Sequence, residues 1–287
     1  MTNHPGDAAP PTTAVRIDVA GLSDRGKVRP ENQDHFLVVR TGRFSETLAT
    51  SLPVGEIPER SADRGLLMMV ADGMGGHSAG EVASRTVIAT MTRLILDHPE
   101  WILKVDEDSV ADLEERTLAR YRALDYALAE RMHDDPALRG MGTTLTVAFS
   151  LGLDLFIGHV GDSRAYLFRD GAVRQITRDH THVQRMVDAG MLTREEAAGH
   201  RLRNVLTNVL GGETRSVDVE RHQLRLESGD ELLLCSDGLT GVVTDEEIAG
   251  ILAGSASASE ACRRLVDCAL ERDAPDNVTA LVARYQL

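Results

Sequence analysis

Aspartate residues recur where apolar, strand-like runs of this chain meet its loops. Asp72 follows "LLMMVA", Asp237 follows "LLLCS" and Asp162 follows "FIGHVG". Asp34 precedes "HFLVV", and Asp276 lies just before "VTALV". Each aspartate alone fits a turn or a strand-end cap. Five of them in such places favour a cluster, and carboxylates that converge near a core need a cation to neutralise them.

The ligand types in such a cluster indicate which ion it would bind. Oxygen ligands without His or Cys select Mg²⁺ or Mn²⁺ over zinc. Glycine directly follows both Asp72 and Asp237, which lets backbone carbonyls or waters approach an ion. The residues alone therefore leave two interpretations open, a divalent-metal site or a set of separate turns.

The stretch "ADGMGGHSAGE" also resembles a phosphate-binding loop. Gly75 and Gly80 have P-loop spacing, but Glu81 stands where the phosphate-binding lysine would be. The dinucleotide-binding fingerprint fails too, because Ser78 replaces its third glycine. A nucleotide cradle is therefore disfavoured.

Composition excludes several functional classes. The 287 residues are 42% hydrophobic and carry a formal charge of −14, which argues against nucleic acid or an anionic membrane as the main partner. No apolar run approaches the roughly 18 residues of a membrane span. The three cysteines, Cys235, Cys262 and Cys268, lack metal-ligand spacing and predict a reducing compartment. Residues 1–14 lack the pattern of a signal peptide, so the cytoplasm is the expected location.

Strands and helices come in blocks along the chain. Residues 1–14 are predicted to be a disordered lead-in, and 41–64 a loop or irregular insertion, because prolines and a glycine occur there without periodicity. The region 181–210 is predicted to be helical in pieces, with a capping box at Thr193. Because strict β-α-β alternation is absent, we expect an α+β domain with antiparallel sheets and helices packed outside them. No domain boundary is predicted within 15–287.

Seven sequence blocks match a known family in their order along the chain. They are "RPENQD", "VADGMGGHSAGEVAS", "GTTLTVAF", "GHVGDSRAYL", "LTNVLGG", "LLLCSDGLTGVV" and "DNVTALV". Together they resemble the metal-dependent protein serine/threonine phosphatases, the PPM or type 2C family, in its bacterial form. The resemblance implies one catalytic domain over 15–287, a four-layer α-β-β-α sandwich of two mainly antiparallel sheets with flanking helix pairs. It also implies a flap at about 181–210 beside the catalytic cleft.

The resemblance further implies metal-binding roles for the aspartates. Asp72 would bridge two Mn²⁺ or Mg²⁺ ions, with the carbonyl of Gly73 on one of them. Asp237 and Asp276 would bind the second ion. Asp34 would bind a metal directly or through a water, and would take part in catalysis.

The same resemblance implies a substrate site and a reaction. Asp162, with Asp237, would hold a weaker third ion. Arg29 would hold the substrate phosphate, a role that suits a planar bidentate donor. A hydroxide bridging the two metals would attack the phosphorus of phosphoserine or phosphothreonine. The implied partners are phosphorylated proteins, including a Ser/Thr kinase and its substrates, and the enzyme is expected to be a monomer.

Histidines are the least determined residues of the predicted site. His77 is a candidate acid near the phosphate or simply a residue at a helix N-terminus; eukaryotic members place a histidine directly after Asp-Gly, where this chain has Met74. His159 is predicted to pack in a core strand, and His180 and His182 to lie in a loop. Two other functions remain open, a non-catalytic binding module and a hydrolase of small phosphate esters.

Overall fold

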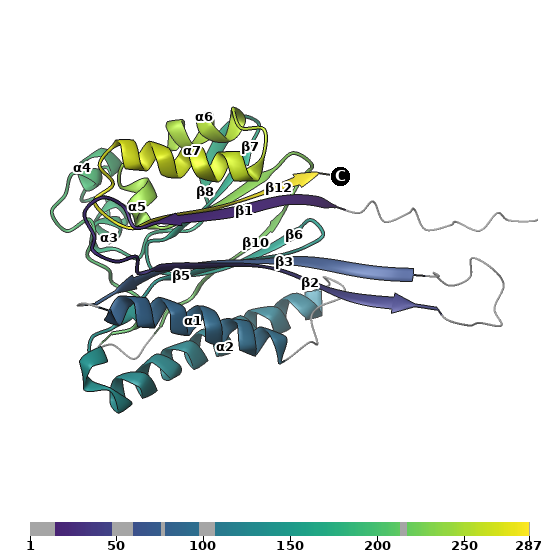
Figure 1. The fold of residues 1–287 in the computed structure, drawn as a ribbon, viewed down its shortest axis with the longest axis horizontal. Coiled ribbons are helices and arrows are strands. Elements are labelled where there is room, and N and C mark those ends of the chain that lie inside the picture. The colour runs from purple at the N-terminus through teal and green to yellow at the C-terminus, as the bar shows by residue number, and fades with distance from the viewer. Residues whose placement is uncertain (1–14, 48–59, 76–77, 98–106, 213–216, 287) are drawn as a thin grey trace, which may run out of the picture.

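The computed structural model describes residues 15–47, 60–75, 78–97, 107–212 and 217–286. They form four layers, with two β-sheets face to face and helices covering both outer faces (Figure 1). The predicted α-β-β-α sandwich is therefore confirmed. The predicted lead-in of residues 1–14 lies outside the described residues.

The first sheet contains five strands. Their spatial order is β1 (Arg16–Asp24), β12 (Val278–Gln286), β11 (Glu231–Cys235), β7 (Arg164–Arg169) and β8 (Ala172–Gln175). All their pairings are antiparallel. A hairpin turn at Asp170-Gly171 joins β7 to β8, and these residues have positive φ angles of 53° and 81°, as such a tight turn requires.

The second sheet contains seven strands. Their spatial order is β10 (Glu220–Arg225), β6 (Asp154–Val160), β5 (Leu145–Leu151), β3 (Arg60–Met74), β4 (Gly142–Thr143) and β9 (Leu210–Gly211), with β2 (Asp34–Glu46) also paired to β3. The β2–β3 register places Asp34 opposite Asp72. Two of the predicted ligands are thus neighbours on adjacent strands.

Helix pairs cover the two outer faces of the sandwich. The longer pair, on the second sheet, is α1 (Ala79–Leu96) and α2 (Glu107–Asp134). The other face carries α6 (Asp245–Ala253), α7 (Ala258–Glu271) and the short α5 (Asp237–Thr240). A 3₁₀ turn at Pro136–Leu138 leads from α2 to β4.

Three clusters of buried side chains occupy the three interfaces between the layers. Tyr121, Leu124 and Leu128 of α2 are fully buried against the second sheet, as the helical spacing of this segment predicts. Aliphatic residues of β3, β5, β11 and β12 fill the space between the sheets. Leu265 and Val266 of α7 pack on the first sheet. The aspartates at the strand ends are thus held by a continuous apolar scaffold.

The prediction of an irregular segment over 41–64 was wrong at both ends. Strand β2 continues to Glu46 and β3 begins at Arg60, in an unbroken antiparallel register. Ladder hydrogen bonds need no apolar alternation, so a polar hairpin arm leaves no hydrophobic signal in the sequence. The intervening residues 48–59 lie outside the described part.

The region 181–210 is helical in pieces, as predicted. It contains α3 (His182–Asp188) and α4 (Arg194–Ala198), and Thr193 forms the predicted capping box with Glu196. His182 is not a loop residue but the first residue of α3, because the Thr181 side chain caps this helix. His180 lies in the loop, and His159 is fully buried in β6.

None of the described helices combines the length and the apolar character needed to cross a membrane.

The N-cap of α7 provides a test of the outer helical layer. The Ser257 hydroxyl accepts a hydrogen bond of 3.2 Å from the Glu260 amide. We expect Ser257→Ala to lower the free energy of unfolding by about 1 kcal/mol, measured by urea denaturation. Ser257→Thr keeps the cap and is the matched control. Equal stability of both variants and the wild type would contradict the assignment.

Candidate metal centre

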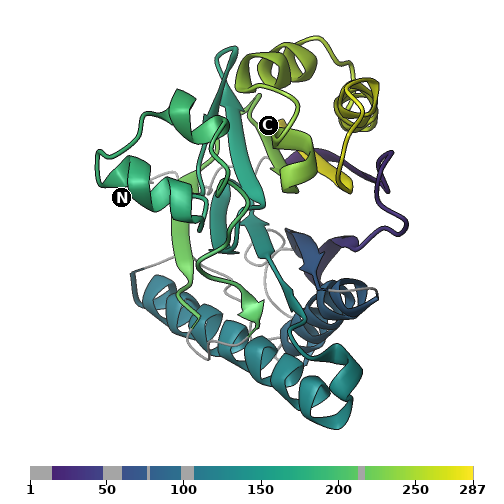
Figure 2. The same cartoon turned by 90° about the vertical axis from the view of Figure 1, so that its left-hand side faces the viewer.

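The predicted ligands gather at one end of the sandwich, where the chain crosses between the sheets. Figure 2 looks onto this end, with the green helices of the 181–210 region projecting to one side. The β1–β2 loop carries Arg29 and leads to Asp34, and the β6–β7 turn carries Asp162. Asp237 follows β11 and Asp276 precedes β12. Both sheets therefore contribute carboxylates to a single place.

Asp34 is the most enclosed of these carboxylates, with 4% of its surface exposed. Its Oδ2 accepts hydrogen bonds from Ser236 Oγ (2.7 Å) and Thr279 Oγ1 (2.6 Å). Its Oδ1 is buried and has no hydrogen-bond partner among the described residues. Burial raises the pKa of Asp34 to about 7, with further contributions from Asp237 and Asp276, although the two hydroxyl groups oppose the shift.

Asp72 and Asp237 are close enough that each affects the pKa of the other. Burial raises the pKa of Asp72 well above its usual range, and the charges of Asp34 and Asp237 raise it further. Burial also raises the pKa of Asp237 to about 6, followed by repulsion from Asp276. The buried Asp237 Oδ1 has no partner among the described residues either. Carboxyl groups so close together must share protons or a cation.

Asp162 and Arg29 complete the cluster. Asp162 is 7% exposed, and burial, then the charge of Asp237, raises its pKa well above the usual range. Arg29 Nη2 donates to Asp276 Oδ2 over 2.6 Å, and this bond is the main cause of the raised pKa of Arg29. The Arg29 side chain is 53% exposed, so its other donors face the solvent.

Two glycines allow the ligand-bearing loops to approach each other closely. A Cβ on Gly73 would lie 2.1 Å from the Gly80 carbonyl oxygen, and one on Gly238 would lie 1.9 Å from that of Asn277. Both positions therefore exclude any side chain. Close packing between the loops therefore requires glycine after both Asp72 and Asp237. This is a second reason for these glycines, besides the access for an ion that the sequence predicts.

Several supporting residues were missed by sequence reasoning. Asn277 accepts from the Gln33 amide (2.8 Å) and donates to the carbonyls of Arg25 (2.8 Å) and Glu31 (2.9 Å). It thereby fixes the loop that carries Arg29 to the loop that carries Asp276. Its place next to Asp276 was visible, but its partners lie more than 240 positions away in the chain.

A second group of missed residues supplies hydroxyl groups. Ser236 and Thr279 hold Asp34, as described above. Thr144 Oγ1 lies 3.0 Å from the Asp72 amide, and Thr143 Oγ1 donates to the Asp72 carbonyl over 2.7 Å. Hydrogen bonds therefore hold both the backbone amide and the backbone carbonyl of Asp72.

The residues present fit a site for divalent cations. Buried oxygens of Asp34 and Asp237 have no hydrogen-bond partner among the described residues, and burial together with the charges of neighbouring carboxylates raises the pKa of both side chains. The aspartate side chains offer only oxygen atoms as metal ligands, which suits Mg²⁺ or Mn²⁺. The predicted site residue His77 lies outside the described residues. Met74, at the position where eukaryotic members have a histidine, is 40% exposed.

A cleft of about 330 Å³ opens beside this centre. Asp162, Asp237 and Asp276 line one wall. Residues of the predicted flap, including Val183, Gln184, Arg194 and Arg203, line the other. The 181–210 region therefore borders the space in which a substrate would contact the carboxylate cluster.

A second group of possible ligands lies apart from the aspartates. The ligand atoms of His159, His180 and Glu220 all lie within 4.8 Å of one another. This geometry alone would suit a transition metal. The hydrogen bonds around these residues, treated below, decide what the group does.

Comparison with known proteins places this architecture in a family. Residues 59–273 match the family described as Protein phosphatase 2C. The serine/threonine protein phosphatase PstP of Mycobacterium tuberculosis is 40% identical over 92% of this chain, which spans only 44% of the length of that relative. The serine/threonine phosphatase stp of Listeria innocua is 32% identical, with 92% of this chain and 94% of the relative covered.

A solved structure agrees with these sequence relatives. The crystal structure of the PstP catalytic domain in complex with two manganese ions superposes with a TM-score of 0.73 at 37% identity, covering 95% of this chain and all of that one. With the matched segment, the relatives and the fold in agreement, the chain belongs to the protein phosphatase 2C family.

Proposed function

We propose that this protein is a Mn²⁺- or Mg²⁺-dependent protein serine/threonine phosphatase that hydrolyses phosphoserine and phosphothreonine monoesters. One observation carries the proposal: five aspartates from both sheets converge beside a cleft, and two of them direct buried, unpartnered oxygens into the cluster. Membership of the family and the manganese-bound relative support the same reading. The catalytic unit that we propose comprises residues 15–287, with 181–210 as the flap.

Each residue of the site has a defined task in this proposal. Asp72, Asp237 and Asp276 would hold the ions, with the carbonyl of Gly73 as a further ligand. Asp34 would align a ligand water through the oxygen that Ser236 and Thr279 leave free. When bound, the ions supply a nucleophilic water at neutral pH and neutralise the phosphoryl oxygens.

Two further residues would act at the edges of the site. Asp162, with Asp237, would contribute to a third and weaker ion site on the flap side. The Arg29 guanidinium is anchored through one nitrogen to Asp276 and would present its remaining donors to the substrate phosphoryl group.

The natural substrates that we propose are proteins phosphorylated by a Ser/Thr kinase, including the kinase itself. The open cleft and its flap wall suit a protein chain better than a small ester. We further propose that the enzyme acts as a monomer in the cytoplasm, where Cys235, Cys262 and Cys268 would remain the free thiols found in the structure.

Metal dependence gives the first test of this function. We expect Mn²⁺ to support phosphate release from a phosphothreonine peptide, EDTA to abolish it, and Asp237→Asn to reduce it on the order of 10²-fold or more. The same substitution should lower the rise in melting temperature that Mn²⁺ produces in the wild type. It should not destabilise the metal-free protein, because it removes a repelling charge.

The outcomes of this experiment separate the alternatives. Activity that survives both EDTA and Asp237→Asn would contradict a metal-dependent mechanism. A folded, Mn²⁺-binding wild type without activity on any phosphoester would favour the non-catalytic binding module. Activity restricted to small aryl phosphates would favour a hydrolase of small esters.

Arg29 provides a separate test of phosphate recognition. We expect Arg29→Lys to raise KM for the phosphopeptide on the order of tenfold, because lysine cannot make a planar bidentate contact. Metal binding measured by calorimetry should change little. Lys27→Ala is the matched control, since Lys27 carries the same charge in the same loop but pairs with the exposed Asp273. An equal effect of both substitutions would contradict a specific role for Arg29 in binding the phosphate.

A further inference from the structure

The two ends of the flap meet at a narrow neck, formed by residues 180–182 and 205–208. The Thr207 amide donates to the His180 carbonyl (2.8 Å), and the His182 amide donates to the Val205 carbonyl (2.9 Å). Between these bonds, Thr181 and Leu206 form an antiparallel bridge. The flap is thus a loop whose two ends are hydrogen-bonded to each other, and this neck sets its position relative to the sheets.

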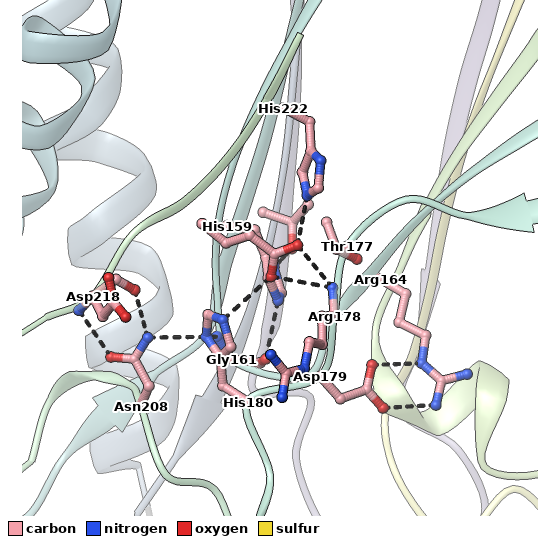
Figure 3. A network of polar contacts seen from close by, with 12 residues as sticks. His159, Gly161, Arg164, Thr177, Arg178, Asp179, His180, Asn208, Asp218 and His222 are labelled. Atoms are coloured by element: carbon pink, nitrogen blue, oxygen red, sulfur yellow. Dashed lines mark hydrogen bonds and ion pairs between the residues drawn. The ribbon is translucent and has the colours of Figure 1, made fainter. Parts of the chain in front are cut away.

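His180 connects the neck to the turn that carries Asp162. Its backbone amide donates to the Gly161 carbonyl over 2.7 Å, and its Nδ1 accepts from the Gly161 amide over 3.1 Å. Gly161 has a φ of 113°, and a Cβ there would lie 2.5 Å from Thr144. Both polar groups of this confined glycine, directly before Asp162, are therefore bound by one residue of the flap neck (Figure 3).

These contacts define the tautomer of the His180 imidazole. A backbone N–H can only donate, so Nδ1 of His180 must be the acceptor. The Asn208 amide nitrogen points to the same Nδ1 (2.9 Å), and its orientation is set by Asp218, whose amide donates to Asn208 Oδ1 and whose carbonyl accepts from Asn208 Nδ2. The proton of the neutral ring consequently lies on Nε2, which faces Glu220 Oε2 at 3.3 Å.

Glu220 is an acceptor fixed by several donors. Both its oxygens lie 3.1 Å from the Arg178 amide, and Oε1 lies 2.5 Å from His222 Nε2. Burial opposes its ionisation, but the hydrogen bonds from His180 and His222 outweigh burial and lower its pKa to about 2. The carboxylate on β10 therefore holds the outer nitrogen of His180 while Gly161 holds the inner one.

The same hydrogen bonds argue against a metal at this group. His159 Nε2 donates to the Gly161 carbonyl over 3.0 Å, while its Nδ1 lies 2.8 Å from Thr146 Oγ1. Both imidazoles therefore use their Nε2 protons in hydrogen bonds. A metal on His180 Nε2 would require a proton on Nδ1, directly opposite the Gly161 N–H. The group is arranged for hydrogen bonding in one tautomer.

We propose that His180 is a positioning residue that fixes the flap to the Gly161–Asp162 turn through the acceptor Nδ1 of its imidazole. One side chain then positions both the flap and Asp162, so the flap wall of the cleft and this carboxylate keep a defined separation. This inference rests on the proposed phosphatase function only for its kinetic consequences. The predicted tautomer and the anchoring of the flap can be measured without activity.

Two substitutions distinguish the roles of the two ring nitrogens of His180. His180→Asn places an amide oxygen near the position of Nδ1, so it keeps the acceptor for the Gly161 amide and gives up the contact with Glu220. His180→Gln reaches Glu220 with an amide nitrogen but leaves the Gly161 amide without its acceptor. His222→Asn removes the other histidine contact of Glu220 without touching the neck and is the matched control.

We expect His180→Gln to lower kcat/KM for the phosphothreonine peptide about tenfold, a change of about 1.4 kcal/mol, and to raise the Mn²⁺ concentration needed for half-maximal rate. Its effect on p-nitrophenyl phosphate, which is too small to need the flap, should be less than about threefold. His180→Asn and His222→Asn should stay within about threefold of the wild type on both substrates. Equal losses in both His180 variants, a larger loss in His180→Asn, or no loss in either would overturn the proposal.

Two measurements keep the test independent of catalysis. In ¹⁵N-resolved NMR of the wild-type imidazoles, His180 should show a protonated Nε2 and an acceptor Nδ1, and the opposite tautomer would overturn the assignment. Hydrogen exchange of the amides in 181–206 should be faster in His180→Gln than in His180→Asn. If the wild type lacks phosphatase activity but both measurements agree with expectation, the proposed function fails while the positioning role stands.

Discussion

Repulsion among buried carboxylates is the constraint on which the rest of this structure depends. Besides burial, the charge of Asp237 raises the pKa of both Asp34 and Asp72, and that of Asp34 also raises the pKa of Asp72, yet Asp34 and Asp72 belong to the second sheet and Asp237 follows β11 of the first. An apolar sandwich supplies the force that holds them together, because the buried aliphatic side chains between the sheets offset an electrostatic cost that would otherwise separate the loops. The carboxylates are thus placed by a scaffold that takes no part in the chemistry.

Short polar side chains turn that scaffold into a defined geometry. Ser236 and Thr279 occupy one oxygen of Asp34 and leave the other free, and Asn277 closes the loop around Arg29 with three hydrogen bonds. None of these groups adds charge. They fix the orientation of the Asp34 carboxylate and the position of the Arg29 loop without changing the negative charge of the cluster, as a pre-organised site requires.

The layers and the strand ends that carry the aspartates could be predicted from the sequence because both leave local signals. Apolar runs that end in aspartate are visible within ten residues, and the family blocks give their order. The extension of the β2–β3 arm to Glu46 and Arg60 was missed because cross-strand hydrogen bonds do not depend on side-chain type. The clamps made by Asn277 and His180 were missed for another reason, since each joins segments that become neighbours only after folding. Roles for individual aspartates came from the family resemblance, and no spacing in this chain would have supplied them.

The two walls of the cleft are held in different ways, and this difference has a functional consequence. The carboxylate wall is continuous with the buried core of both sheets, so a substitution there disturbs packing and charge together. The flap wall, with α3 and α4, is joined to the rest of the chain through its neck and through an ion pair between Arg178 and Asp188 at the end of α3, and the bidentate Arg164–Asp179 pair at 2.8 and 2.7 Å holds the segment that precedes it. Residues of the flap can therefore vary in shape and charge without moving the carboxylate cluster. Under the proposed function, this arrangement would separate a fixed reactive wall from a recognition wall that has its own attachments.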